Sequence, residues 1–208
     1  AKVLIVSTKV QNILWAQVDQ VPTLRKLIRA EELDGNTLVP EIPTIEADDL
    51  SFLQYTSGST SDPKGVMVSH RSLMANINAI MGDHYQATRE RDVVVSWLPL
   101  YHDMGLIGKV LCTLVWGCSG VYIPTLRFIK RPSCWLDAIH RHRGTLTFAP
   151  NFALALAARR TRASEMEQWD LSCIRSVGCG AEPIQAETVR HFTKVFHEGA
   201  NMPIGAVS

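Results

Sequence analysis

The fold of this chain is decided by the stretch Tyr55-Thr56-Ser57-Gly58-Ser59-Thr60-Ser61-Asp62-Pro63-Lys64-Gly65. It places five hydroxyl side chains around one glycine and closes with a Pro-Lys-Gly turn. Apolar residues on either side, at 52–55 and 66–68, predict two strands that hold the stretch between them as a loop. Such a loop presents backbone amides, hydroxyls and one ammonium to a single point, and these are the donors that a polyanion needs.

Individual positions of this loop support a phosphate site. Gly58 and Gly65 are expected to allow positive φ and a close approach of backbone to ligand. Pro63 stiffens the chain before Lys64. The common nucleotide P-loop needs Gly-Lys-Ser/Thr, whereas Lys64 here stands between a proline and a glycine, so this is a different phosphate loop. The alternative is an ordinary surface loop between hairpin strands, since Ser, Thr, Gly and Asp are common in loops.

Strands and helices alternate along the rest of the chain. The patterns predict strands at 3–7, 50–55, 93–98, 120–123, 145–148 and 174–177, and helices at 18–33, 69–81, 106–116, 132–142, 151–160 and 183–197. Several of these strands are apolar on both faces, which indicates an α/β fold with a mostly parallel sheet flanked by helices. Ligands of such folds bind at the carboxyl ends of the strands, where three polar, glycine-containing segments fall.

The second of these segments is Ser96-Trp97-Leu98-Pro99-Leu100-Tyr101-His102-Asp103-Met104-Gly105-Leu106-Ile107-Gly108, between a predicted strand and an apolar helix. His102 and Asp103 suggest a general base with its carboxylate. Side chains adjacent in sequence point in different directions, so a direct relay between them is not expected. The alternative is a turn in which Asp103 caps the next helix.

The third segment is Ser176-Val177-Gly178-Cys179-Gly180-Ala181-Glu182-Pro183. Gly180 and Ala181 offer a flat surface without large side chains, and Glu182 precedes a proline that can start a helix. Taken alone, this segment fits a helix N-terminus with an acidic cap equally well.

Together these motifs resemble the adenylate-forming superfamily, which contains acyl-CoA synthetases, luciferases, peptide-synthetase adenylation domains and fatty acyl-AMP ligases. The loop resembles its phosphate-binding signature, although the family usually has glycine where this chain has Ser61. The segment W-L-P-x-x-H-D-M-G-L resembles fatty acyl-AMP ligases in particular. So do Ala149-Pro150-Asn151-Phe152 and Arg159-Arg160 followed by Asp170-Leu171-Ser172. These matches run in order from about residue 50 to the end of the chain.

The resemblance assigns roles to residues of this sequence. It implies that Lys64 and His102 are catalytic, with His102 beside the substrate carboxylate. The residues implied to bind the nucleotide are Thr56, Ser57, Gly58, Ser59, Thr60, Lys64, Gly65, Gly180, Ala181, Glu182 and Pro183. The residues implied to bind the acid are Trp97, Tyr101, His102, Asp103, Met104, Gly105 and Asn151, of which Met104 and Gly105 would shape a tunnel for the acyl chain. No residue is assigned as a metal ligand.

The same resemblance implies a ligase that uses ATP and Mg²⁺ to convert a fatty acid into acyl-AMP. The acyl group would pass to the pantetheine of an acyl carrier protein in lipid or polyketide synthesis. An acyl-CoA synthetase is one alternative, and a non-catalytic module that binds a nucleotide or a carrier protein is another. The family's Mg-binding acid, ribose-binding aspartate and C-terminal lysine are absent from these residues. We therefore expect residues 1–208 to be an incomplete piece of an N-terminal AMP-binding domain, without the C-terminal lid domain.

Composition narrows the remaining possibilities. The 208 residues are 46% hydrophobic with a net charge of +1, which suits one globular unit and argues against nonspecific nucleic-acid binding. Five cysteines without a C-x-x-C pair predict reduced thiols in a cytoplasmic protein. The longest apolar stretch, 106–116, is too short for a transmembrane segment and carries Lys109, so it predicts a buried helix. His140 and His142 predict a solvated helix end rather than a metal site.

Overall fold

Four parallel strands form the central sheet of this chain. The computed structural model describes residues 2–11, 14, 21–33, 43–56 and 64–207. The sheet has the order β6 (Ser119–Tyr122), β5 (Val93–Ser96), β7 (Leu146–Ala149) and β8 (Ser176–Cys179), and every neighbouring pair is parallel. This arrangement confirms the predicted α/β fold with a parallel sheet.

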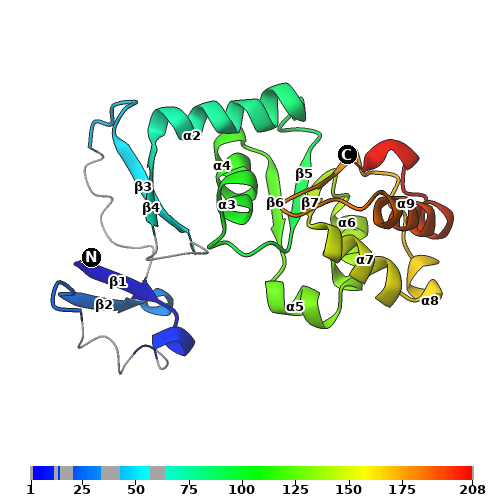
Figure 1. Cartoon of the computed structure of the whole chain (residues 1–208), viewed down its shortest axis with the longest axis horizontal. Helices are drawn as coiled ribbons and strands as arrows, with labels where there is room; N and C mark the ends of the chain where they lie inside the picture. The colour runs from blue at the N-terminus through cyan, green and yellow to red at the C-terminus, as the bar shows by residue number, and fades with distance from the viewer. Residues whose placement is uncertain (1, 12–13, 15–20, 34–42, 57–63, 208) are drawn as a thin grey trace. The chain divides into compact units, whose positions relative to one another are not determined.

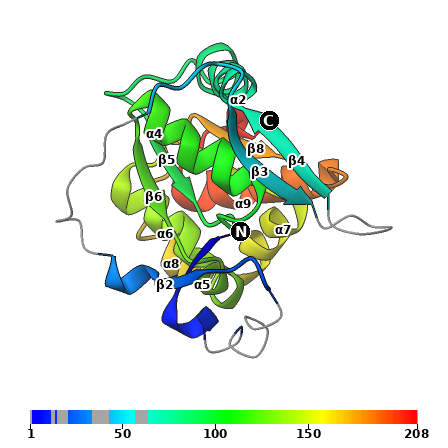
Figure 2. The ribbon, with the colours of Figure 1, turned by 90° about the vertical axis from the view of Figure 1, so that its left-hand side faces the viewer.

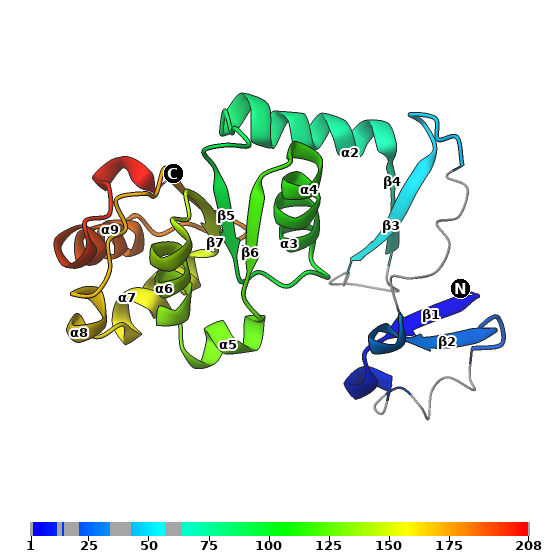
Figure 3. The same cartoon turned by 180° about the vertical axis from the view of Figure 1, so that it is seen from behind.

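Helices cover both faces of this sheet, as Figures 1 and 3 show from opposite sides. One face carries α2 (His70–Ile77) with its π-helical continuation η2 (Asn78–His84), then α3 (Asp103–Gly105), η3 (Leu106–Leu111) and α4 (Cys112–Trp116). The other face carries α6 (Ser133–His142), α7 (Asn151–Arg160) and α9 (Ala186–Ala200). Short helices α5 (Thr125–Lys130), α8 (Ala163–Met166) and η4 (Ile204–Ala206) connect these elements.

Adjacent residues of β5 show why the sheet is apolar on both sides. Val94 packs with Ile77 and Cys112 on the face of α2 and α4, the face nearer the viewer in Figure 2. Val95 packs with Trp135 and Leu154 on the opposite face. Since successive side chains of a strand point to opposite sides, both valines can be buried only when helices lie on both faces.

An antiparallel hairpin precedes this sheet in the chain. It consists of β3 (Leu50–Thr56) and β4 (Lys64–Ser69), in which Thr56 pairs with Lys64. Ser69 ends β4 and caps α2, because its side chain accepts a hydrogen bond from the backbone N–H of Ser72 at 3.2 Å. The predicted cap at Ser69 is therefore confirmed, and the helix continues past the predicted end at residue 81 to His84.

The predicted helix at 18–33 is wrong in its described part. The structure separates into two compact units, residues 1–45 and 46–208, and this segment lies in the first. There β1 (Val3–Val6) pairs in parallel with β2 (Lys26–Arg29), and η1 (Ala30–Glu32) follows. Leu27 and Ile28, read as a helical face, instead pair with residues of β1, because a short apolar pair suits a strand equally well. Pro22 also lacks the N–H that a helix interior needs.

Smaller differences concern the helix at 106–116 and the last two elements. The helix is buried on one face only: Lys109 and Cys112 are buried, whereas Leu114 is 73% exposed. The last strand begins at residue 176 instead of 174, and α9 begins at residue 186 instead of 183. Among the described helices, none is both long and apolar enough to cross a membrane.

Candidate functional site

A cavity of about 310 Å³ lies where residues following β5, β7 and β8 meet. We call it the His102 cavity. It brings together five residues that the sequence assigned to one site, namely Trp97, His102, Met104, Ala181 and Glu182. The other lining residues are Leu98, Pro99, Thr125, Ile129, Pro150 and Phe152. A position at the carboxyl ends of parallel strands is the one expected for a ligand of this fold.

His102 and Asp103 contact each other, contrary to the expectation that neighbouring side chains would point apart. His102 Nδ1 lies 2.6 Å from Asp103 Oδ1. The backbone is extended at His102 and becomes helical at Asp103, and this change of direction turns the two side chains together. His102 Nδ1 also accepts from the Met104 N–H at 3.4 Å. When Nδ1 carries a proton it donates to the Asp103 carboxylate instead, and a neutral imidazole then keeps Nε2 as an acceptor. Asp103 Oδ1 also accepts from the Met104 N–H at 2.7 Å. The N-cap of α3 is nevertheless His102, and Asp103 is the first residue of the helix, so the predicted cap at Asp103 is wrong by one residue.

The segment after β8 is bonded to the start of α7. Glu182 Oε1 accepts from the Phe152 N–H at 2.6 Å, and Asn151 Oδ1 accepts from the Gln185 N–H at 3.0 Å. Glu182 is thus an acidic cap, but of α7 rather than of the helix that follows it. Ala181 adopts a φ of 69°, a left-handed conformation that is uncommon for residues other than glycine. In the turn that it forms, Ala181 lines the cavity. These bonds explain why α9 begins later than predicted.

Several predicted site residues line neither this cavity nor the larger one described below. Tyr101 is 83% exposed, and its carbonyl accepts from Gln54 Nε2 at 3.2 Å. Gly105 packs against the carbonyl oxygen of Pro99, which a Cβ at this position would overlap. Asn151 is buried and holds Gln185, so its role in the structure is positional. The cavity linings also leave out Gly180 and Pro183.

The phosphate loop is described only at its two ends. Ser57, Gly58, Ser59 and Thr60 lie outside the described residues. Thr56 ends β3 opposite Lys64, an exposed residue that begins β4, so the hairpin brings both ends of the loop together. The expectation of positive φ at Gly65 is wrong, because this residue is part of β4 and pairs with Tyr55 in extended conformation.

A second cavity of about 450 Å³ lies on the α2 side of the sheet, and we call it the Lys109 cavity. Met104 lines both cavities and so marks where they adjoin. Most of the lining surface is apolar. The remaining lining residues are Asn76, Ala79, Ile80, His84, Tyr85, Asp103, Ile107, Gly108, Lys109 and Phe148.

Lys109 is the exceptional residue of this second cavity. It is only 4% exposed, and its Nζ lies 5.5 Å from the ring centroid of Tyr85 and 5.6 Å from that of Phe148. Burial lowers the pKa of Lys109 to about 8, against a smaller opposing effect of Cys112. Burial likewise raises the pKa of the Cys112 thiol to about 11, so this thiol is neutral at pH 7.

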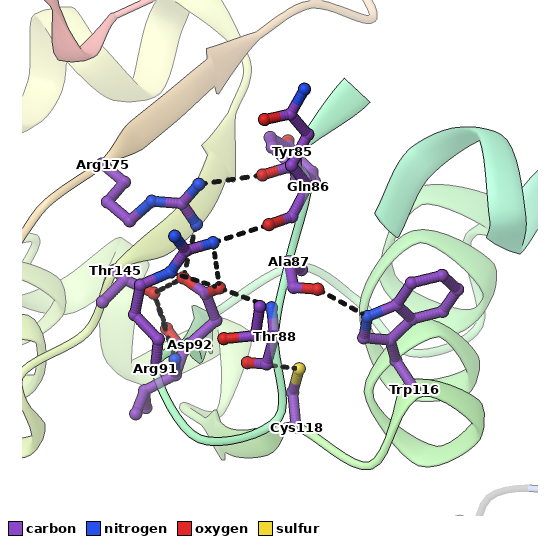
Figure 4. Close-up of polar contacts among 11 residues, drawn as sticks. Tyr85, Gln86, Ala87, Thr88, Arg91, Asp92, Trp116, Cys118, Thr145 and Arg175 are labelled. Carbon is purple, nitrogen blue, oxygen red and sulfur yellow. Dashed lines mark hydrogen bonds and ion pairs between the residues drawn. The ribbon is translucent and has the colours of Figure 1, made fainter. Parts of the chain in front are cut away.

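Asp92 is the centre of a polar network that the sequence analysis missed (Figure 4). Its buried carboxylate accepts from Arg175 at 2.6 Å, from Thr145 Oγ1 at 2.8 Å and from the Thr88 N–H at 2.8 Å. Burial raises the pKa of this carboxyl, but these hydrogen bonds, with one from Arg91, together hold the pKa below its ordinary value. The feature of the sequence that could have indicated this network is an aspartate directly before an apolar strand.

The network fixes the loop that follows η2. Arg175 also donates to the carbonyl of Tyr85 at 2.9 Å, and Arg91 donates to the carbonyl of Gln86 at 2.6 Å. Gln86 adopts a φ of 46°, which is uncommon for a residue other than glycine. Because Tyr85 lines the Lys109 cavity, the network determines where one wall of that cavity stands.

Comparison with known proteins identifies the family. The sequence model of the family described as AMP-binding enzyme matches residues 1–204. The chain belongs to this family. Within the described residues, no group of three or more His, Cys, Asp or Glu side chains could hold a metal ion.

Relatives and solved structures show which members of the family this chain is similar to. The chain is 43% identical over 155 residues to a putative acyl-CoA synthetase of Caulobacter vibrioides, covering 74% of this chain and 27% of that protein. It is 37% identical over 174 residues to the long-chain-fatty-acid–AMP ligase FadD26 of Mycobacterium marinum, covering 82% and 30%. A Legionella pneumophila fatty acyl-adenylate ligase, solved with acyl adenylate and pyrophosphate, matches with a TM-score of 0.84 at 32% identity, covering 99% and 35%. The chain thus spans about a third of the length of these proteins.

Proposed function

We propose that this chain is the nucleotide- and acyl-binding part of an enzyme that activates a fatty acid with ATP to form acyl-AMP. The observation that carries the proposal is the meeting of two cavities at Met104. One is lined by His102, which contacts Asp103, and by the turn at Ala181, and the other is larger and mainly apolar. This division suits an acid whose carboxylate reacts beside a nucleotide while its chain is buried. Family membership and the relatives named as fatty-acid–AMP ligases support the same function.

In the reaction, a carboxylate oxygen attacks the α-phosphorus of ATP and pyrophosphate leaves. Catalysis then depends on placing the two reactants and on stabilising charge on the phosphate oxygens. His102, oriented by Asp103, would hold the acid near the attacked phosphorus. Lys64, at one end of the phosphate loop, would stabilise the departing phosphates with its ammonium. Mg²⁺ is expected with ATP, but the described residues contain no cluster suited to hold it, and no step here depends on it.

The acyl chain would lie in the Lys109 cavity, where each buried CH₂ contributes roughly 0.8 kcal/mol. We propose a carrier-protein pantetheine as the acceptor of the acyl group, in lipid or polyketide synthesis, and a cytoplasmic location. The similarity to a putative acyl-CoA synthetase favours coenzyme A as the second candidate acceptor.

Fatty-acid-dependent exchange of labelled pyrophosphate into ATP tests the proposal, measured on the full-length protein that contains this chain. We expect exchange with medium- or long-chain acids. Coenzyme A and a pantetheine-loaded carrier domain are then compared as acceptors of the acyl group. Binding of ATP without exchange for any acid would instead support a non-catalytic nucleotide-binding module.

A further inference from the structure

A buried cation with no carboxylate partner among the described residues lies in the cavity that the acyl chain would occupy. Lys109 is the only lysine or arginine among the described residues that line this cavity. No described carboxylate lies within ion-pair distance of its ammonium, and the lining Asp103 is paired with His102. Its Nζ lies over the rings of Tyr85 and Phe148, 5.5 and 5.6 Å from their centroids.

This arrangement is unfavourable for the chain on its own. An ammonium removed from water loses solvation that two aromatic faces replace only in part. A purely hydrocarbon cavity could be lined at this position by leucine or methionine at no such cost. Burial also lowers the pKa of Lys109 only to about 8, so most molecules carry the charge at pH 7.

The walls around the ammonium suit a chain with a charged end. Ile80, Ile107 and Phe148 supply apolar surface of the kind that buries methylene groups. Met104 separates the ammonium's cavity from that of His102, so a ligand occupying both would pass this residue. A second anionic group on such a ligand would neutralise the ammonium of Lys109, which is itself buried.

We infer that the preferred acid is a dicarboxylic acid, with one carboxylate reacting beside His102 and the other paired with Lys109. This inference rests on the proposed function, whose site it shares. Lys109 acts as a specificity-determining residue: it binds the unreactive end of the substrate and takes no part in bond making or breaking. This charge-assisted contact gives the buried ammonium a partner that the described residues do not supply.

The test measures kcat/KM for pyrophosphate release by the full-length protein. The substrates are the α,ω-dicarboxylic acids from hexanedioic to hexadecanedioic acid, and the monocarboxylic acids of matched length. We expect at least one dicarboxylic acid to exceed its matched monocarboxylic acid about tenfold to hundredfold. Lys109→Met should reverse that preference, and Lys109→Arg, which keeps the charge, should retain part of it. Lys130→Met is the matched control, because Lys130 is exposed and lines neither cavity, and it should leave the preference unchanged.

The outcomes separate this inference from the proposed function. A preference for monocarboxylic acids that Lys109→Met changes by less than twofold would overturn the role of Lys109 while leaving fatty-acid activation intact. The same holds if hydroxy acids, rather than dicarboxylic acids, show a preference that depends on Lys109. If none of the acids tested supported pyrophosphate release, the proposed function itself would be refuted. Direct binding of the acids, followed by competition, gives a second readout for any variant that binds but does not turn over.

Discussion

Replacing Asp92 with asparagine should destabilise the chain far more than a comparable change at an exposed ion pair. Asp92→Asn keeps the shape of the side chain but removes the negative charge of the carboxylate. Arg175, Thr145 Oγ1 and the Thr88 N–H all donate hydrogen bonds to this carboxylate. The NH₂ group of the new asparagine also replaces one carboxylate oxygen, so it faces at least one of these hydrogen-bond donors without being able to accept from it. Loss of one partner of a buried pair costs about 3 to 5 kcal/mol. We expect the lower end, about 3 kcal/mol, because the Arg175 side chain is 31% exposed and can be partly hydrated.

The assay is urea unfolding of the 208-residue chain at pH 7, followed by tryptophan fluorescence. A loss of this size corresponds to a fall in midpoint of roughly 1 to 2 M urea. The control is Asp48→Asn, whose side chain is 79% exposed and pairs with an exposed Arg71, so its urea midpoint should change little. Equal midpoints for the two variants would refute the view that the network holds the loop at Tyr85.

The stability difference between the wild type and Asp92→Asn should depend on pH, because the pKa of Asp92 is lowered in the native state. A carboxyl whose native pKa is depressed contributes stability above its unfolded pKa and loses it as the pH falls through the native value. The difference in unfolding free energy between the wild type and Asp92→Asn should therefore be full at pH 7 and shrink below about pH 4. A difference that stays constant down to pH 2 would contradict this assignment.

Three further substitutions test other parts of the structure. Lys109→Met should raise the unfolding free energy at pH 7 by about 1 to 3 kcal/mol, because a base whose pKa is lowered in the native state penalises folding below that pKa. Chemical denaturation should show this gain disappear between about pH 8 and 11. A gain independent of pH would show that better packing of methionine is the cause instead. Gly105→Ala should cost about 1 to 3 kcal/mol in the same assay because its Cβ overlaps the Pro99 carbonyl, whereas Gly108→Ala, with nothing within 4 Å of its Cβ, should be neutral or stabilising. Lys64→Ala should reduce ATP turnover by the full-length protein while changing the thermal midpoint little, as expected for an exposed residue; a collapsed melt with unchanged turnover per folded molecule would make the role of Lys64 structural.

The central sheet could be predicted from sequence because its signal is local and strong. Val93, Val94 and Val95 are three consecutive apolar residues, and only burial on two faces accounts for that in so short a strand. The predicted helix at 151–160 agrees with α7 at both ends, since proline precedes it and its alanine- and leucine-rich run favours a helix. The helix predicted at 18–33 rested on the spacing of apolar residues at 21, 24, 27 and 28. Two of these, Leu27 and Ile28, instead pair with residues of β1 that lie more than 20 residues away along the chain. Short-range spacing carries no information about such partners.

The site was predictable in its motifs and less so in its contacts. Trp97, His102 and Met104 follow one strand closely, and the structure places all three in one cavity. The bond between Glu182 and the start of α7 joins segments 30 residues apart, so no pattern within either segment revealed it. Lys109 was visible as one charge in an apolar helix. Its surroundings, supplied by Tyr85 and Phe148 from other elements, appear only in the folded chain.

The most direct test of fatty-acid activation follows the oxygen atoms of the acid. The full-length protein is given ATP, an acceptor thiol and a fatty acid labelled with ¹⁸O in both carboxylate oxygens, and the nucleotide product is analysed by mass spectrometry. Attack of the carboxylate on the α-phosphorus places one labelled oxygen in AMP once the acyl group has left, and this is the result we expect. Unlabelled AMP, or label found in inorganic phosphate together with ADP, would contradict acyl-adenylate formation.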